Sequence, residues 1–392
     1  MAEMNQKLKI SGKKIAVFCF AAAAVLLLIL EVTGIFGLLD GILNPEFSIK
    51  RAAAISYEVG VNPQITGGAG GFFLTTRDSM RFFNADGAEV FRDSHPFLNP
   101  VLFGRGGFAA ILEPAGNVVQ VYNTSGLLHR IVLDGPVISF SINCLGYFAV
   151  IIHRGGDIYD FRVYNNFGRL ESYGPHADAN IIPMLTDISP DGRFLAVSYL
   201  DITSAQLNSR INFKFTRQAD YLAHDFTHGI FASSLSNPDQ VIGAMRFMDN
   251  GNLAVISDTR IFAVEPSSGR TLWEISVGNR ISQFYIGGDW ILAAYGEALL
   301  NRQGRAAGEL VAYDAQGREI FSLNVGVADS LAVAGNSGIV EVGGHFTAFN
   351  RDGLILWDFV LPNNVIDVAK IGADGFVAAM PVEAVIYRRI RN

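Results

Sequence analysis

Residues 148–152 read FAVII, an unbroken apolar run that ends at His153. A strand with one solvated face alternates apolar and polar side chains, so a short continuous run indicates a strand buried on both faces. Seven similar runs occur, at residues 72–76 (FFLTT), 108–112 (FAAIL), 194–198 (FLAVS), 253–256 (LAVI), 290–294 (WILAA), 339–342 (IVEV) and 376–380 (FVAAM). Such repetition indicates that each of these strands lies between neighbouring sheets.

A turn signal recurs between these runs. An aromatic residue is followed by Asn or Asp and, after two further residues, by Gly. Asn and Asp bond to their own backbone in turns and Gly accepts a positive φ, so the pattern predicts hairpins. The copies are residues 83–87 (FNADG), 122–126 (YNTSG), 164–168 (YNNFG), 313–317 (YDAQG) and 349–353 (FNRDG), with a variant one residue longer at 264–269 (VEPSSG).

The spacing of the buried runs predicts the architecture. The runs begin 36 to 59 residues apart, and β-propeller repeats of four strands are roughly 40 to 50 residues long. Each repeat then reads as strand A, buried strand B, strand C, the Gly turn and strand D. We therefore expect an all-β fold, an eight-bladed β-propeller, with seven blades as the alternative.

The ends of the chain predict how the ring closes. The last repeat supplies strands A, B and C near residues 363–370, 375–380 and 384–389, and has no strand D after them. Residues 53–60 (AAISYEVG) resemble strand D elsewhere, such as residues 318–326 (REIFSLNVG). We expect this N-terminal strand to complete the last blade and to leave no open sheet edge. The propeller would then span residues 53–392.

An apolar segment precedes the propeller. Residues 15–39 contain a single charge and include the run IAVFCFAAAAVLLLIL, and about 20 apolar residues suffice to span a bilayer. Four lysines lie within residues 1–14, which by the positive-inside rule keeps this tail in the cytoplasm. The segment predicts a single-pass cell-membrane protein with a transmembrane helix at 15–39, a linker at 40–52 and an extracytoplasmic propeller. The rival interpretation is a cleaved signal peptide, whose apolar region is usually shorter, about 7 to 15 residues.

Composition excludes several classes of protein. Half of the residues are hydrophobic and 17% are charged, so the chain has a large core and is not disordered. The net charge of −7 argues against a nucleic-acid partner. Of the two cysteines, Cys19 falls in the apolar N-terminal segment, so the propeller has neither an internal disulfide nor a cysteine metal site. We expect Cys144 to be a small buried core residue.

Two stretches resemble known propeller repeats. Residues 263–274 (AVEPSSGRTLWE) and 350–358 (NRDGLILWD) resemble the pyrroloquinoline-quinone-like repeat, and residues 188–199 (ISPDGRFLAVSY) resemble tryptophan-aspartate and Tol-type repeats. With its apolar N-terminus, the whole chain resembles an uncharacterised bacterial family of membrane-anchored propellers. Quinoprotein dehydrogenases hold their cofactor with a vicinal disulfide and calcium, and this chain has no Cys-Cys pair. The resemblance therefore implies no cofactor, and scaffold subunits such as the lipoprotein of outer-membrane assembly are the nearer analogy.

The longest insertions, at residues 173–182, 200–209, 232–240 and 296–308, fall mostly in D–A and B–C loops. Because the membrane segment leads into a D strand, these loops should point away from the membrane. Loops on a rigid scaffold often carry function, so we expect partner binding on this outward rim. The candidate residues are His153, Asp157, His176, Asp178, Asp201, Glu297 and Arg302.

His224 and His228 have the spacing of two metal ligands but lack the Glu of an HExxH helix, so we expect no metal. The sequence contains no catalytic motif that we would assign. We therefore expect a non-enzymatic binding or scaffolding module for a protein or cell-wall polymer. The alternative is an extracytoplasmic hydrolase or lyase that acts at the outward mouth of the propeller channel.

Overall fold

The structure is a computed structural model that describes residues 47–58, 62–217, 230–233, 237–238, 240–298, 307–361, 365–372 and 374–391. Residues 51–388 form one compact unit, and residues 1–50 with 389–392 form a second. Among the described residues, no helix has the length and apolar character needed to cross a bilayer. The predicted tail 1–14 and transmembrane segment 15–39, together with the first part of the linker 40–52, lie outside the described residues.

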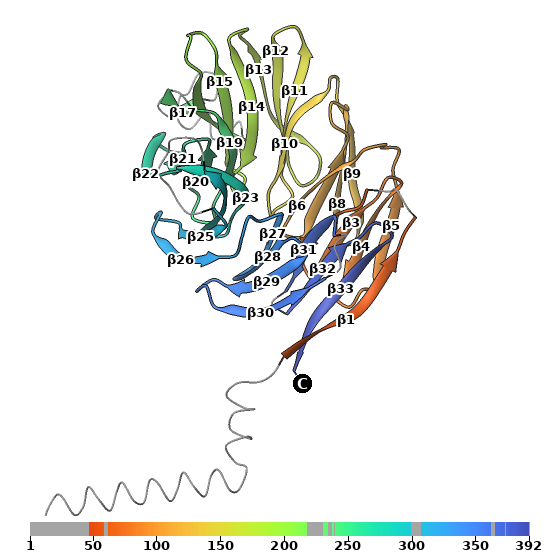
Figure 1. Ribbon diagram of the computed structural model, residues 1–392. Coiled ribbons are helices and arrows are strands. Elements are labelled where there is room, and N and C mark those ends of the chain that lie inside the picture. The colour runs from red at the N-terminus through yellow and green to blue at the C-terminus, as the bar shows by residue number, and fades with distance from the viewer. Residues whose placement is uncertain are drawn as a thin grey trace, which may run out of the picture. The chain divides into compact units, whose positions relative to one another are not determined.

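The described strands form eight sheets, one for each blade (Figure 1). Blades 1 to 4 are β2 (Gln64–Gly68), β3 (Gly71–Thr75), β4 (Ser79–Asn84), β5 (Glu89–Ser94); β6 (Val101–Arg105), β7 (Phe108–Leu112), β8 (Val118–Asn123), β9 (Gly126–Val132); β10 (Val137–Ile142), β11 (Phe148–Gly155), β12 (Ile158–Tyr164), β13 (Leu170–Ala177); and β14 (Ile181–Ile188), β15 (Phe194–Asp201), β16 (Asn208–Phe215), β17 (Ile230–Ser233), with the short β18 (Asn237–Pro238) also pairing with β16.

Blades 5 to 8 follow the same order. They are β19 (Ile242–Phe247), β20 (Leu253–Ser257), β21 (Arg260–Glu265), β22 (Arg270–Ser276); β23 (Asn279–Gly287), β24 (Trp290–Ala298), β25 (Glu309–Asp314), β26 (Glu319–Asn324); β27 (Ser330–Ala334), β28 (Ser337–Val342), β29 (His345–Asn350), β30 (Ile355–Val360); and β31 (Asp367–Ile371), β32 (Gly375–Ala379), β33 (Glu383–Arg391), β1 (Phe47–Ser56).

The first strand of each blade contacts the first strand of the next blade, and β31 contacts β2, so the described inner strands make a closed circuit. The prediction of eight blades is confirmed, and the seven-blade alternative is wrong.

Each of the eight apolar runs is the second strand of a blade, as the sequence predicts. Every residue of β3, β20 and β32 is buried, whereas every residue of β22, the outermost strand of blade 5, is exposed or partly buried. Neighbouring blades share their cores: Ile256 and Ile261 of blade 5 belong to the same cluster as Ile291 and Val311 of blade 6. The B strands are therefore buried because a blade covers each of their faces.

The Gly turns join neighbouring blades. Gly317, on the C–D turn of blade 6, has φ 77°, and a Cβ there would lie 2.5 Å from the Trp273 ring of blade 5. Trp273 also donates an indole N–H bond to the Ala315 carbonyl of this turn at 2.9 Å. Gly353 meets Phe321 of the preceding blade in the same way. The Gly and Trp of the repeat thus form a contact between blades, because the ring occupies the space of a side chain.

The N-terminal strand closes the ring, as predicted, with shifted bounds. β1 begins at Phe47 and ends at Ser56, whereas the predicted strand is 53–60. It pairs with β33, and the Tyr57 N–H donates to the Val382 carbonyl at 3.0 Å just beyond the strand. Ile55 is 7% exposed and packs in one cluster with residues of blades 1 and 8. Part of the chain before the first blade therefore completes the last one.

Two expectations from the sequence are wrong. Residues 173–182 are not a loop, because β13 and β14 extend through them to Ala177 and from Ile181. Cys144 is exposed, because it lies on the A–B turn of blade 3. The Asn143 side chain accepts the N–H groups of Leu145 and Tyr147, both at 3.0 Å, and so stabilises the turn that carries Cys144.

Candidate functional site

The eight inner strands surround an axial channel that contains two cavities. One, of about 450 Å³, is lined by inner strands of blades 2 to 6. The other, of about 610 Å³, lies at the end of the channel that carries the A–B turns. Both are lined by Gly104, Arg246 and Tyr285, so they adjoin each other. Volumes of this size are typical of ligand sites in proteins.

Arg105 crosses this channel. It lies at the end of β6 in blade 2, and its Nη2 donates to the Phe247 carbonyl of blade 5 at 2.7 Å. Its Nη1 lies 3.6 Å from Oδ2 of Asp187 in blade 4. The Arg105 and Asp187 side chains are only 11% and 6% exposed, so this ion pair has little screening by water. One side chain therefore connects three blades across the ring.

Asp187 is held by blade 5 as well. Its Oδ2 accepts the Phe247 N–H at 2.6 Å. Burial raises the pKa of the Asp187 carboxyl, and the guanidinium groups of Arg105 and Arg246 oppose that rise. Burial and the like charge of Arg105 lower the pKa of Arg246. Two buried guanidinium groups thus share a single buried carboxylate.

Asp367 and Lys370 lie on the inner strand of blade 8 and line the larger cavity. Oδ2 of Asp367 accepts the Ile65 N–H of blade 1 at 2.8 Å, and burial raises the pKa of this carboxyl to about 6. Nζ of Lys370 donates to the carbonyls of Gly372 and Gly375 at 3.0 and 3.1 Å, and burial lowers its pKa to about 8. Both side chains are bonded to backbone of the blade 8–blade 1 region, which suggests a structural role.

Two of the predicted rim residues come together through a tyrosine. The ring centroids of His153 and Tyr159 are 5.1 Å apart, and His176 lies 6.5 Å from Tyr159 and 5.2 Å from Tyr199. His176 stands on β13, the outermost strand of blade 3, and faces blade 4. His153 lies at the end of the second strand of blade 3, β11, and His176 lies on the outermost strand, β13, so neither residue is on the inner strand that lines the channel.

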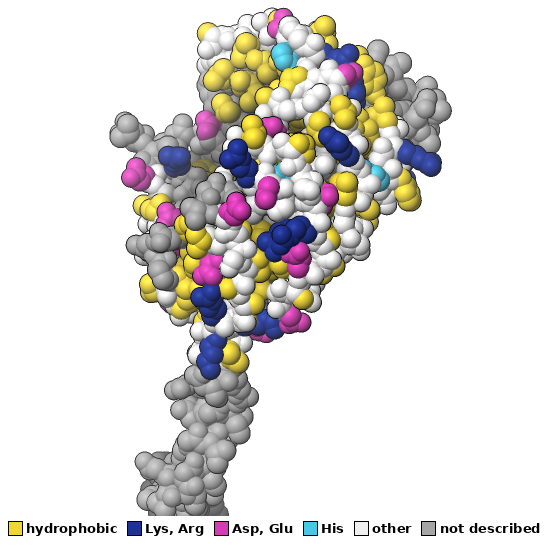
Figure 2. All heavy atoms as spheres, turned by 90° about the vertical axis from the view of Figure 1, so that its right-hand side faces the viewer, with side chains coloured by type: hydrophobic (Ala, Val, Ile, Leu, Met, Phe, Trp, Pro, Cys, Tyr) yellow, Lys and Arg dark blue, Asp and Glu magenta, His cyan; other side chains and the backbone are white. Residues whose placement is uncertain are grey.

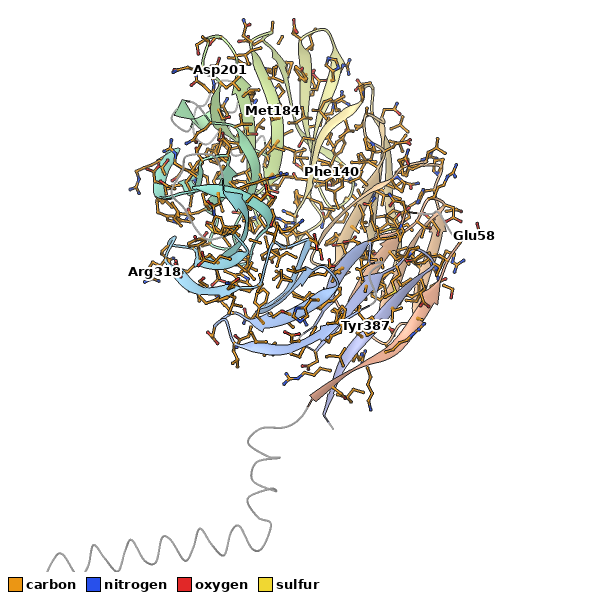
Figure 3. The ribbon with its side chains drawn as sticks, viewed as in Figure 1. Glu58, Phe140, Met184, Asp201, Arg318 and Tyr387 are labelled. Carbon is orange, nitrogen blue, oxygen red and sulfur yellow. The ribbon has the colours of Figure 1, made fainter. Side chains whose placement is uncertain are left out.

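The other predicted rim residues are separate from this cluster. Asp157 is exposed at the tip of the β11–β12 hairpin. Asp178 accepts the Asn180 N–H at 2.9 Å in a tight turn. Asp201 accepts bonds from Thr203, which lower the pKa of its carboxyl, and pairs with Arg210. Figure 3 shows Asp201 at the periphery of the ring, far from Phe140 near the centre.

Glu297 is exposed near the end of β24. Arg302 lies outside the described residues, as do His224 and His228.

The channel residues Arg105, Asp187 and Arg246 were not predicted from the sequence. A signal for them exists, because each is a charge at or next to the A–B end of an otherwise mostly apolar inner strand: VLFGR, IIPMLTDI and IGAMRF. Three charges near the same end of the first strand in different repeats indicate that the side chains lie near the same end of the ring.

The model of a family of unknown function, DUF5711, matches residues 54–381. The chain belongs to this family. The match begins within β1 and ends just after β32, so the family covers most of the propeller. No curated protein matches the sequence.

Several solved propellers are similar in fold. BamB from Moraxella catarrhalis is 12% identical with a TM-score of 0.52, over 87% of this chain and 100% of that one. The Dos1 propeller is 9% identical with a TM-score of 0.54, over 87% and 95%. Apo AztD from Citrobacter koseri is 12% identical with a TM-score of 0.51, over 80% and 89%. These identities show a shared fold alone.

Removing Arg105 alone should destabilise the fold more than removing Arg105 together with the charge of Asp187. Arg105→Met removes the bond to Phe247 and leaves the Asp187 carboxylate buried without its nearest cation, so we expect a loss of about 3 kcal/mol in the free energy of unfolding. Adding Asp187→Asn should recover at least about 1 kcal/mol, because Asn still accepts the Phe247 N–H and carries no charge. Urea unfolding followed by tryptophan fluorescence measures both.

Arg318→Met is the matched control for this pair. Arg318 is 77% exposed and pairs with Asp314 on the surface, so its loss should cost less than about 0.5 kcal/mol. If the Arg105 and Arg318 variants unfold at the same urea concentration, the contacts of Arg105 across the channel do not stabilise the fold.

Proposed function

We propose that this protein is a propeller tethered to the cell membrane by residues 15–39, with the propeller outside the cytoplasm. We further propose that it acts as a non-enzymatic binding or scaffolding module. Its partner would be a protein that binds the rim formed by the B–C and D–A loops of blades 3 and 4. The observation that carries this proposal is a group of exposed apolar and aromatic side chains on that rim.

The rim group lies on adjacent blades. Ile158, on the B–C hairpin of blade 3, is 47% exposed, and Ile202 and Leu207, on the B–C loop of blade 4, are 40% and 46% exposed. Tyr159 and His153 are half-buried beside Ile158. Exposed apolar side chains next to aromatic ones are characteristic of protein interfaces, where a few such residues provide most of the binding energy.

Charge also favours a protein partner. On the face in Figure 2, Lys and Arg side chains are interspersed with Asp and Glu, without a continuous basic stripe among the described residues. Nucleic-acid binding requires such a stripe. A cell-wall polymer would stack sugar rings on Tyr159 and His153, and the experiment below distinguishes it from a protein.

The direction of β1 supports the orientation that we propose. β1 is strand D of blade 8, and every D strand begins at the end of its blade that carries the C–D turn. An anchor before Phe47 would therefore turn the A–B and C–D end toward the membrane. The rim of blades 3 and 4 would then face away from it, free for a partner.

The orientation can be measured with reporters fused after Asn392. Alkaline phosphatase, which folds only outside the cytoplasm, should be active there, and green fluorescent protein exported through the general secretion route should be dark. The same reporters fused after residue 14 serve as the inverse control. An inactive phosphatase with a bright fluorescent fusion at the C-terminus contradicts the proposed location.

The rim can be tested by photocrosslinking in cells that express the full chain. A benzophenone amino acid in place of Ile158 should give a discrete protein adduct that Ile202→Asp abolishes. The control is the same probe in place of Phe167, which is 71% exposed but lies on a C–D turn. Adducts from position 167 alone would contradict a binding site on the rim. An adduct that muramidase degrades and protease does not would show that the partner is a wall polymer and not a protein.

A further inference from the structure

We propose that the A–B end of the channel binds a small anion through a carboxylate or phosphate group held between Arg105 and Arg246. This site is distinct from the rim and does not depend on the membrane tether.

Unused hydrogen-bond donors converge at this site. Nη1 of Arg105 is buried and makes no hydrogen bond to any described residue. Arg246 donates from Nη1 to the Ile286 carbonyl at a long distance of 3.4 Å. Tyr285, which carries a hydroxyl, lines the same cavity. Buried donors are normally satisfied, so these groups are suited to a ligand that accepts hydrogen bonds.

The charges select an anion. Arg105 and Arg246 repel each other, and the one buried carboxylate between them, Asp187, already accepts the Phe247 N–H and faces Arg105. Asp249 is exposed at the mouth of the cavity, whereas Asp367 and Lys370 are bonded to backbone on the blade 8 side. A carboxylate or phosphate can bind a guanidinium group through two parallel bonds, which would give Nη1 of Arg105 a hydrogen bond in addition to its 3.6 Å ion pair with Asp187.

The shape of the cavity favours a small ligand that enters from the A–B end. Short turns with small residues surround this mouth, at Ala69, Gly106, Gly288, Gly335 and Gly372. The adjoining cavity is lined largely by apolar side chains, among them Phe103, Phe140 and Phe284, so an anion would lose more of its hydration there than at the A–B end. The volume of about 610 Å³ accommodates a metabolite-sized molecule.

Titration calorimetry on the purified full chain tests the site. The probes are inorganic phosphate and succinate, each at a constant ionic strength set with chloride. We expect saturable binding of at least one probe, and the probe that binds identifies the group. Arg246→Gln should weaken this binding at least tenfold, because a charge-assisted hydrogen bond is lost. Arg318→Gln, a change of the same kind on the surface, should leave it unchanged.

A second measurement uses the wild-type chain and so does not depend on how the variant folds. Phenylglyoxal modifies accessible arginines, and mass spectrometry reports each site. The bound probe should slow the modification of Arg105 and Arg246 and leave Arg318 unaffected. The proposal fails if neither probe binds more tightly than chloride, or if Arg246→Gln binds like wild type. Neither outcome bears on the rim, which lies at the other end of the blades.

Discussion

The whole fold depends on the burial of eight short strands on both faces. A strand such as β3, β20 or β32 presents apolar side chains to both sides, and a single sheet cannot cover both. Each blade therefore needs a neighbour on each side, and only a closed ring supplies one to every blade. In the last blade, β31, β32 and β33 are joined by β1, a strand from before the first blade.

Closure has a second consequence at the centre. Packing the blades in a ring brings the ends of distant inner strands together, so Arg105 reaches Phe247 although the two residues are 142 positions apart in sequence. The same geometry concentrates Arg105, Arg246 and Asp187 in a poorly hydrated space, where electrostatic interactions are stronger than at the surface. Short A–B turns with small residues, such as Gly106 and Gly335, surround the mouth of this space.

The repeat made the fold predictable, because its signals are local. An apolar run and an Asn–x–x–Gly turn each determine the structure of a few residues, whatever the rest of the chain does. Residues 173–182 misled because Gly174 and Pro175 are typical of loops. Both lie on β13, the outermost strand of blade 3, opposite Phe161 and Asp160 of β12. A proline is tolerated on an edge strand because its missing N–H can face away from the sheet.

The channel site was harder to predict for a different reason. Each of its charges is one residue in a mostly apolar strand, and only the ring places them together. The rim residues were found as loop residues, yet their contacts depend on which strands of adjacent blades face each other. The ring of His176 contacts the ring of Tyr199 in the next blade. Nothing in the sequence near either residue indicates that the two are neighbours.

Closure of the ring by the N-terminal strand is the claim on which the account rests, and a pair of substitutions in β1 tests it most directly. Ile55 is buried and Ala54 is exposed, so Ile55→Asp should lower the free energy of unfolding in urea by about 3 kcal/mol. Ala54→Asp should change it by less than about 0.5 kcal/mol. If both variants unfold at the wild-type urea concentration, the N-terminal strand is not part of the ring.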